Sequence, residues 1–93
     1  MQFWQLAFNK NAQKQFVKLP KNVQVRIFAF FEERVLTLRN PFAIAVRLVG
    51  DEDELFRYRI GDYRVITQID QGKMIVLAVE IGHRKEVYKK FMH

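Results

Sequence analysis

The chain has 93 residues and a mass of 11.2 kDa, and its 49% hydrophobic and 14% aromatic residues give it the composition of one globular domain over residues 1–93. It contains no cysteine and only two histidines, which excludes a disulfide scaffold, a thiolate zinc site and a histidine-rich metal cluster, so we expect no metal and no cofactor. The net charge of +6 favours polyanionic or acidic partners. No apolar run reaches the ~18 residues of a membrane span, and we expect a cytoplasmic protein.

The N-terminal part predicts one strand followed by two helices. Residues 2–8 are apolar on both faces of an extended segment. Asn9 or Asn11 can cap a following helix. The Leu19–Pro20 step ends that helix, because a residue before proline avoids the α region, and Pro20 suits the first turn of a second helix. We expect an antiparallel helical hairpin, in which the apolar stripe of the second helix comprises Val23, Ile27, Phe30, Phe31, Val35 and Leu38.

The middle of the chain connects this hairpin to the second half. Residues 39–41, Arg-Asn-Pro, stop the second helix. Residues 42–50 are apolar and fit either a short helical turn or an extended connector. The four consecutive acids at residues 51–54 predict a charged, solvated turn.

The second half predicts an antiparallel meander of three strands. Turn signals at residues 61–62 and 70–72 divide it. The strands cover residues 54–60, 62–70 and 73–81. Residues 85–92 predict a short C-terminal helix. The resulting order, β-α-α-β-β-β-α, is typical of an α+β fold.

Three arginines of the meander fall on one face of the predicted sheet. Side chains alternate between the faces of a strand, so Arg57 and Arg59 share the face opposite to Tyr58. On the next strand, Arg64 lies on the same face as these two arginines if Tyr63 and Val65 face the core. Clustered guanidinium groups repel one another, whereas a phosphate would bind them bidentately. The pattern predicts a phosphate-binding face or, alternatively, three solvated arginines on an open face of the sheet.

Three further candidates follow the last predicted strand. His83 carries an imidazole that can transfer protons near neutral pH, although a histidine at a strand end can also be structural or solvated. Arg84 adds a guanidinium group. Tyr88 adds a phenol, which by itself fits an amphipathic packing role equally well.

Two motifs carry a resemblance to a known family. The segment LFRYRIGDYRVI (residues 55–66) and the segment IGHRKEVYKKF (residues 81–91) follow the helical segment FNKNAQKQFVKLPKNVQVRI (residues 8–27). Together, LxRYRxGDYR and GHRxxVY resemble the RelE/ParE superfamily of bacterial toxins, most closely its RelE branch, over nearly the whole chain. The resemblance implies a microbial-ribonuclease-like α+β fold and a single RelE-like toxin domain. It also implies a type II toxin–antitoxin toxin that cleaves mRNA in the ribosomal A site.

The resemblance implies roles for individual residues. Arg57 and Arg59 match basic active-site positions, which are often lysines in the family. Arg64 matches a phosphate-binding position. Arg84 matches the arginine after the last strand, and Tyr88 matches the tyrosine near the C-terminus. Arg57, Arg64 and Arg84 are the expected substrate-binding residues.

Metal-free RNA cleavage also needs a group that accepts the proton of the ribose 2′-OH. Arginine suits the stabilisation of negative charge, but its pKa above ~12 makes it a poor proton acceptor. Two assignments therefore remain open. In the first, His83 is the base, although its position varies in the family. In the second, Arg57 and Arg59 orient the 2′-OH and stabilise its developing charge.

Two other functions are compatible with the sequence. Members of the ParE branch inhibit DNA gyrase with the same fold, and a catalytically inactive basic binding module would keep the charge without the chemistry. For the toxin, the expected partners are a cognate antitoxin, the ribosome with its RNA, and mRNA, but no membrane. Residues 1–50 carry eight basic and two acidic groups, whereas residues 51–93 are balanced, so we expect the first half to dock ribosomal RNA or an acidic antitoxin.

Overall fold

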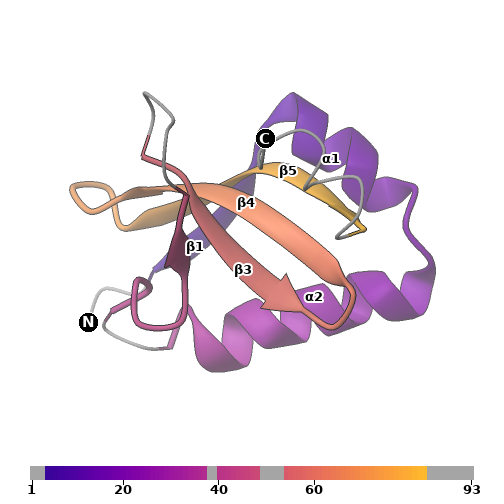
Figure 1. Ribbon diagram of the computed structural model, residues 1–93, viewed down its shortest axis with the longest axis horizontal. Helices are drawn as coiled ribbons and strands as arrows, with labels where there is room; N and C mark the ends of the chain where they lie inside the picture. Colours follow the sequence, from indigo (N-terminus) through magenta and orange to yellow (C-terminus); the bar gives the residue numbers. More distant parts are fainter. Residues whose placement is uncertain (1–3, 38–39, 49–53, 84–93) are drawn as a thin grey trace.

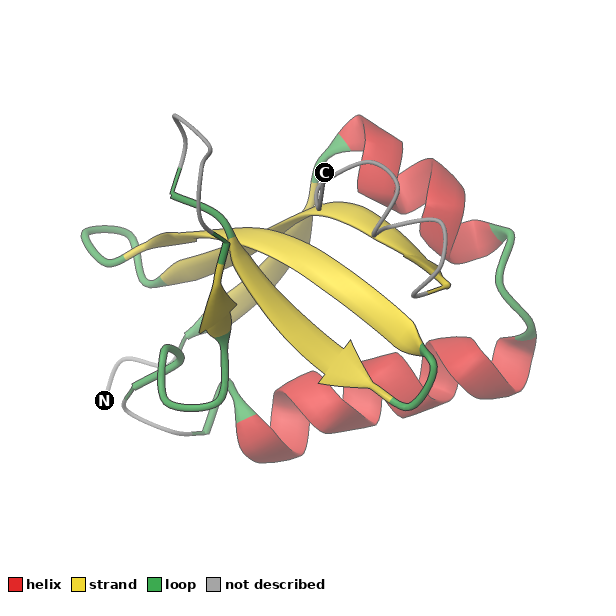
Figure 2. Ribbon diagram, in the orientation of Figure 1, coloured by secondary structure: helices red, strands yellow, loops and turns green. Residues whose placement is uncertain are grey.

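In the part of the chain that the computed structural model describes, residues 4–37, 40–48 and 54–83, two helices lie on one side of a five-stranded sheet (Figures 1 and 2). The strands are β1 (Gln5–Phe8), β2 (Val46–Arg47), β3 (Phe56–Ile60), β4 (Tyr63–Asp70) and β5 (Ile75–His83), and the helices are α1 (Lys10–Val17) and α2 (Lys21–Arg34). The predicted α+β fold is confirmed. The predicted C-terminal helix, residues 85–92, lies outside the described residues. No helix among the described residues is long and apolar enough to span a membrane.

The sheet has the strand order β1-β5-β4-β3-β2. Strands β3, β4 and β5 form the predicted antiparallel meander, and Ile60 pairs with Tyr63 across its first turn. β1 pairs with β5 in parallel, with Phe8 opposite Ala78. β5 therefore has a neighbouring strand on each side and joins the two halves of the chain.

The sequence of residues 42–50 fits either a short helical turn or an extended connector, and the described part of this segment contains both a turn and an extended stretch. Residues 41–44 form a turn, and Val46 then begins the short strand β2, which pairs with Arg57 of β3. The ring of Phe42 packs against the ring of Phe56, with centroids 5.0 Å apart. This contact holds the connector against the end of β3.

The helix ends follow local signals in the sequence. The side chain of Asn9 accepts a hydrogen bond from the N–H of Ala12, 2.8 Å long, so Asn9 is the N-cap of α1. Pro20 precedes the first turn of α2 as its N-cap, with φ −54° and ψ 146°. The C-cap of α2 is Val35, and Leu38 lies outside the described residues.

α1 also covers the edge of β5 beyond the last residue that pairs with β1, Ala78. There the Nδ2 of Asn11 donates to the carbonyl of Val79, at 2.9 Å. One helical turn later the Oε1 of Gln15 accepts from the N–H of Ile81, at 2.7 Å. Two side chains of a helix thus provide the hydrogen bonds that a longer β1 would have made.

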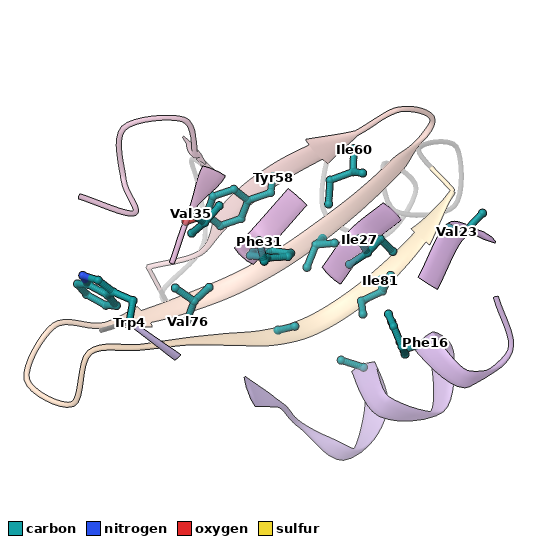
Figure 3. Packing of buried hydrophobic residues seen from close by; sticks show 13 residues of the cluster. Trp4, Phe16, Val23, Ile27, Phe31, Val35, Tyr58, Ile60, Val76 and Ile81 are labelled. Atoms are coloured by element: carbon teal, nitrogen blue, oxygen red, sulfur yellow. The ribbon is translucent and has the colours of Figure 1, made fainter. Parts of the chain in front are cut away.

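The main core fills the space between the two helices and the sheet (Figure 3). Its buried residues are Trp4, Ala12, Phe16, Val23, Ile27, Phe31, Val35, Tyr58, Ile60, Val65, Val76, Ala78 and Ile81. The O–H of Tyr58 donates to the carbonyl of Pro41, at 2.5 Å, and burial raises the pKa of Tyr58 well above its ordinary value. Because Tyr58 and Ile60 face the helices, the residues between and beside them on β3 project from the other side of the sheet.

Candidate functional site

Three arginines share the sheet face that is turned away from the helices. Arg57 and Arg59 alternate with the core residues Tyr58 and Ile60 along β3. Arg59 is the direct cross-strand partner of Arg64 on β4, and Arg57 is a diagonal neighbour of Arg64. In antiparallel sheets, Cβ atoms of direct partners lie about 4.5–5.5 Å apart and those of diagonal neighbours about 7–8 Å apart. The structure thus brings these three predicted site residues together, and we call their surface the arginine face.

Arg64 differs from its neighbours on β3 because it is buried, with only 2% of its surface exposed. Its Nη1 donates to the carbonyls of Gly61 and Tyr63, both at 2.9 Å. The first carbonyl belongs to the turn between β3 and β4, and the second belongs to the first residue of β4. The residue opposite Arg64 on β5 is Gly82, which has no side chain to occupy the same space. Arg64 is therefore a positive charge held in one place, and its burial could not be read from the sequence.

A buried carboxylate lies on the same face, one strand further along. Ile66 of β4 pairs with Arg57 on one side and with Glu80 of β5 on the other. Glu80 is 6% exposed, and its Oε2 accepts a short hydrogen bond from the Nδ2 of Asn11. Glu80 is not among the site residues predicted from the sequence. The signal was a lone acid inside the otherwise apolar run that forms β5.

His83 lies on the other side of the sheet. Its cross-strand partner is Tyr63, and the two rings meet edge to face with centroids 5.9 Å apart. Tyr63 packs against the main core, so its partner also faces the helices. The structure therefore separates His83 from the arginine face, whereas Arg84 and Tyr88 lie outside the described residues.

The basic residues of the first half form an exposed field, as the sequence suggests. Those that the structure describes are all exposed: Lys10, Lys14, Lys18, Lys21, Arg26, Arg34 and Arg47. Arg39 lies outside the described residues. Arg47 pairs with Glu54 at 3.8 Å, and because both side chains are exposed the pair contributes at most about 1 kcal/mol to stability.

The arginine face is suited to binding an anion. Guanidinium groups bind phosphate oxygens through paired, charge-assisted hydrogen bonds, and three of these groups gather on this face. Among residues 4–37, 40–48 and 54–83, no group of three or more histidine, cysteine, aspartate or glutamate side chains is placed to hold a metal ion. The described residues can therefore offer charge stabilisation and hydrogen bonding to a phosphate.

Solved structures of bacterial and archaeal toxin–antitoxin proteins share this fold. A chain of the RelBE2 toxin–antitoxin complex from Mycobacterium tuberculosis is 24% identical, with a TM-score of 0.77, and the match covers 90% of this chain and 94% of that one. A chain of the RelE–RelB complex from Pyrococcus horikoshii is 25% identical, with a TM-score of 0.65 and coverage of 87% and 94%. A mutant of the E. coli toxin RelE in the free state is 26% identical, with a TM-score of 0.67 and coverage of 98% and 95%. The predicted RelE-like fold is therefore confirmed.

The family itself is shown by the sequence. No curated protein matches the chain. Residues 6–88 match the model of a family described as the ParE toxin of the type II toxin–antitoxin system parDE, which lies in the RelE/ParE superfamily. That match spans β1 except its first residue, both helices and the whole meander. The chain therefore belongs to the ParE toxin family of the RelE/ParE superfamily, and it is a toxin of the type II toxin–antitoxin class.

Proposed function

We propose that this toxin is a ribosome-dependent endoribonuclease that cleaves mRNA in the ribosomal A site and so inhibits translation. The observation that carries the proposal is the direct pairing of Arg59 with Arg64, with Arg57 as diagonal neighbour. Three guanidinium groups gathered on one face of a sheet can bind an anion through paired, charge-assisted hydrogen bonds. The backbone of RNA supplies that anion, and the RelE-like fold and the GDYR and GHRxxVY motifs support this choice over other anions.

The proposed reaction uses the ribose 2′-OH as its nucleophile. The hydroxyl gives its proton to solvent hydroxide, its oxygen bonds to phosphorus, and the bond from phosphorus to the 5′-oxygen breaks. The 5′-oxygen takes up a proton, so the products carry a 2′,3′-cyclic phosphate and a 5′-OH. The arginines stabilise the negative charge of the pentacoordinate phosphorane, which is commonly the largest electrostatic contribution to such a rate. Arg64 and Arg84 hold the scissile phosphate in this proposal.

The groups that act on the 2′-OH and on the leaving group are assigned from their position and chemistry. Because His83 faces the helices, Arg57 and Arg59 orient the 2′-OH and stabilise its developing negative charge. Arg84 assists the leaving group, and Tyr88 stacks on a base or transfers a proton. A pH–rate profile tests the remaining candidate for the base. A limb at about pH 6–7 that disappears only in His83→Ala would return that role to the histidine.

We further propose a cognate antitoxin as the neutralising partner, and action in the cytoplasm on translating ribosomes. The M. tuberculosis and P. horikoshii chains that share this fold come from toxin–antitoxin complexes. The exposed basic residues of α1 and α2 would complement an acidic antitoxin or ribosomal RNA.

In vitro translation of a reporter mRNA, followed by primer extension, tests the nuclease. We expect the wild-type protein to produce breaks within codons at the A site. Arg59→Ala should slow cleavage by about 10²–10³-fold, as expected for the loss of one group that stabilises the transition state. Arg47→Ala, an exposed arginine on the neighbouring strand β2, should cleave as fast as wild type. Cleavage by Arg59→Ala at the wild-type rate would contradict the proposal.

The match to the ParE family model favours a second candidate, inhibition of DNA gyrase. That function needs a surface that binds gyrase and has no need for a phosphate-binding face. A plasmid supercoiling assay with purified gyrase separates the two. The nuclease proposal predicts no effect on supercoiling at concentrations that cleave mRNA, whereas inhibition without mRNA cleavage would establish the gyrase inhibitor. Salt-sensitive RNA binding with neither activity would indicate an inactive binding module.

A further inference from the structure

A groove of about 440 Å³ lies between α2 and the edge of β3. It is lined by Phe30, Glu33, Arg34, Ile44 and Arg59, and we call it the α2–β3 groove. β2 pairs only with residues 56–57, so no strand among the described residues pairs with this edge of β3 beyond them. A longer β2 would have filled this position.

Arg59 connects this groove to the arginine face. By strand alternation it belongs with Arg57 and Arg64 on the face away from the helices. Its side chain is exposed and nevertheless lines the groove beside α2, because a long side chain at an uncovered sheet edge can lie along that edge. The two surfaces are therefore continuous around β3, with Arg59 at their boundary.

The groove combines an apolar floor with positive charge. Phe30 and Ile44 provide the apolar surface, and Ile44 is 43% exposed. Arg34 follows Phe30 by one helical turn, so both lie on the same side of α2. Glu33 is the one acid in the lining, against the two guanidinium groups of Arg34 and Arg59.

A third guanidinium group extends this positive stripe toward the turn between β3 and β4. Arg26 precedes Phe30 by one helical turn. Its Nη1 lies 3.4 Å from the point where a Cβ on Gly61 would be, so it is next to the turn. Figure 1 shows the same proximity, with the β3–β4 turn beside α2. Along this side of α2, the guanidinium groups of Arg26 and Arg34 therefore lie on either side of the ring of Phe30.

We propose that the α2–β3 groove binds a stretch of single-stranded RNA, with a base on Phe30 and Ile44 and phosphates on Arg34 and Arg59. This inference rests on the proposed function, because it extends the path of the mRNA beyond the phosphate to be cleaved. Proteins that bind single strands combine aromatic platforms for bases with cationic side chains for the backbone, and the groove has both. The continuity through Arg59 favours RNA over an acidic peptide, since one strand can then occupy both surfaces.

Binding of a short, fluorescein-labelled 2′-O-methyl oligonucleotide tests the groove without the ribosome. The 2′-O-methyl group removes the nucleophile, so binding is measured apart from cleavage. We expect Arg34→Gln to weaken binding at least about fivefold and to lower the slope of log affinity against log salt by about 0.7, the value for one phosphate contact of a single strand. Phe30→Leu should weaken binding at least about fivefold through lost stacking.

Three controls make the test specific. Lys73→Gln removes an exposed charge between β4 and β5 that does not line the groove, and it should leave the affinity unchanged, whereas Glu33→Gln should raise the affinity by removing repulsion. A labelled polyglutamate peptide of equal charge should bind more weakly than the oligonucleotide and should not respond to Phe30→Leu. Because the ring of Phe30 contacts those of Phe31 and Tyr58, its variant is checked by thermal unfolding, and Arg34→Gln at an exposed position gives an independent reading.

Two results would overturn the groove proposal. One is unchanged oligonucleotide affinity in both Arg34→Gln and Phe30→Leu. The other is tighter binding of the acidic peptide than of the oligonucleotide, which would assign the groove to a protein partner. Neither result would affect the nuclease proposal, since mRNA cleavage on ribosomes is measured separately and depends on the arginine face.

Discussion

Arg59 and Arg64 are direct cross-strand partners in the β3–β4 hairpin, yet the first is exposed and the second is 98% buried. The difference arises because Arg64 turns back onto one carbonyl in the hairpin turn and one at the start of β4, and lies opposite a glycine, Gly82. One arginine of the pair can move toward a ligand, and the other is a fixed part of the fold.

The first prediction is that these two arginines contribute differently to the stability of the fold. Arg64→Ala should lower the free energy of unfolding by about 2–4 kcal/mol, because it removes two charge-assisted hydrogen bonds in a buried position. Arg59→Ala should change it by less than about 0.5 kcal/mol, or raise it slightly by relieving repulsion. Urea unfolding measures both. Equal destabilisation by the two variants would contradict the assignment of Arg64 as the fixed charge.

The second prediction concerns the edge of β5 that α1 covers. Gln15→Ala leaves the N–H of Ile81 without its acceptor at a position that is only 2% exposed, so it should cost about 1–3 kcal/mol. Gln13→Ala, at an exposed position of the same helix, is the matched control and should cost less than about 0.5 kcal/mol. Hydrogen exchange at the Ile81 amide should accelerate in the first variant alone. Unchanged exchange there would mean that the side chain of Gln15 does not protect this edge.

The third prediction is a loss of stability in alkali that depends on Tyr58. Burial raises the pKa of Tyr58 in the folded state, so above the ordinary tyrosine pKa of about 10 the unfolded chain loses a proton that the folded chain keeps. The contribution of Tyr58 to the free energy of unfolding is therefore fully present below pH ~10. It declines above that pH, by up to about 1.4 kcal/mol per pH unit.

Tyr58→Phe should remove this part of the decline. It should also cost about 1–3 kcal/mol near neutral pH, because the buried carbonyl of Pro41 loses its donor. Tyr63→Phe serves as the comparison and should keep the alkaline decline. Urea unfolding below and above pH ~10 gives the difference, and parallel pH curves for wild type and Tyr58→Phe would rule out the explanation.

The fourth prediction concerns the turn that Arg64 holds. Gly61 has a φ of 60°, in the left-handed region, at the first position of a two-residue hairpin loop. Gly61→Ala should cost about 1 kcal/mol or more, since a side chain with a Cβ is disfavoured at this positive φ. Gly61→Asn should cost less, because asparagine tolerates this conformation better. Thermal unfolding ranks the three proteins, and a more stable Gly61→Ala would show that the turn is not strained.

Much of this fold could be predicted because local rules dominate in it. The hairpin turn at Gly61 and the period-2 alternation of β3 and β4 are determined by neighbouring residues, and they correctly put Arg57 and Arg59 on the face opposite to Tyr58. The cap at Asn9 is likewise a local signal.

Other features depend on contacts between distant parts of the chain, and the sequence did not indicate them. The face of the sheet on which His83 lies follows from the register of β5 against β4. This register includes a shift next to Ile66 that the sequence pattern does not predict. The burial of Arg64 depends on the absence of a side chain on Gly82, a residue of another strand. The shortness of β2, which opens the α2–β3 groove, is set by the turn at residues 41–44.

The parallel pairing of β1 with β5 has a consequence for how this toxin first forms during protein synthesis. β1 and α1 are made early, but their hydrogen-bonding partners, among them Ile75 opposite Gln5, are made only after the rest of the sheet. Contacts of such large sequence separation form late and leave apolar surface uncovered in the meantime. A nascent chain that stops before β5 therefore lacks the strand that pairs with β4 and supports the arginine face. The activity would appear only with the completed fold, and the uncovered apolar surfaces of the helices would offer a neutralising partner or a chaperone an early place to bind.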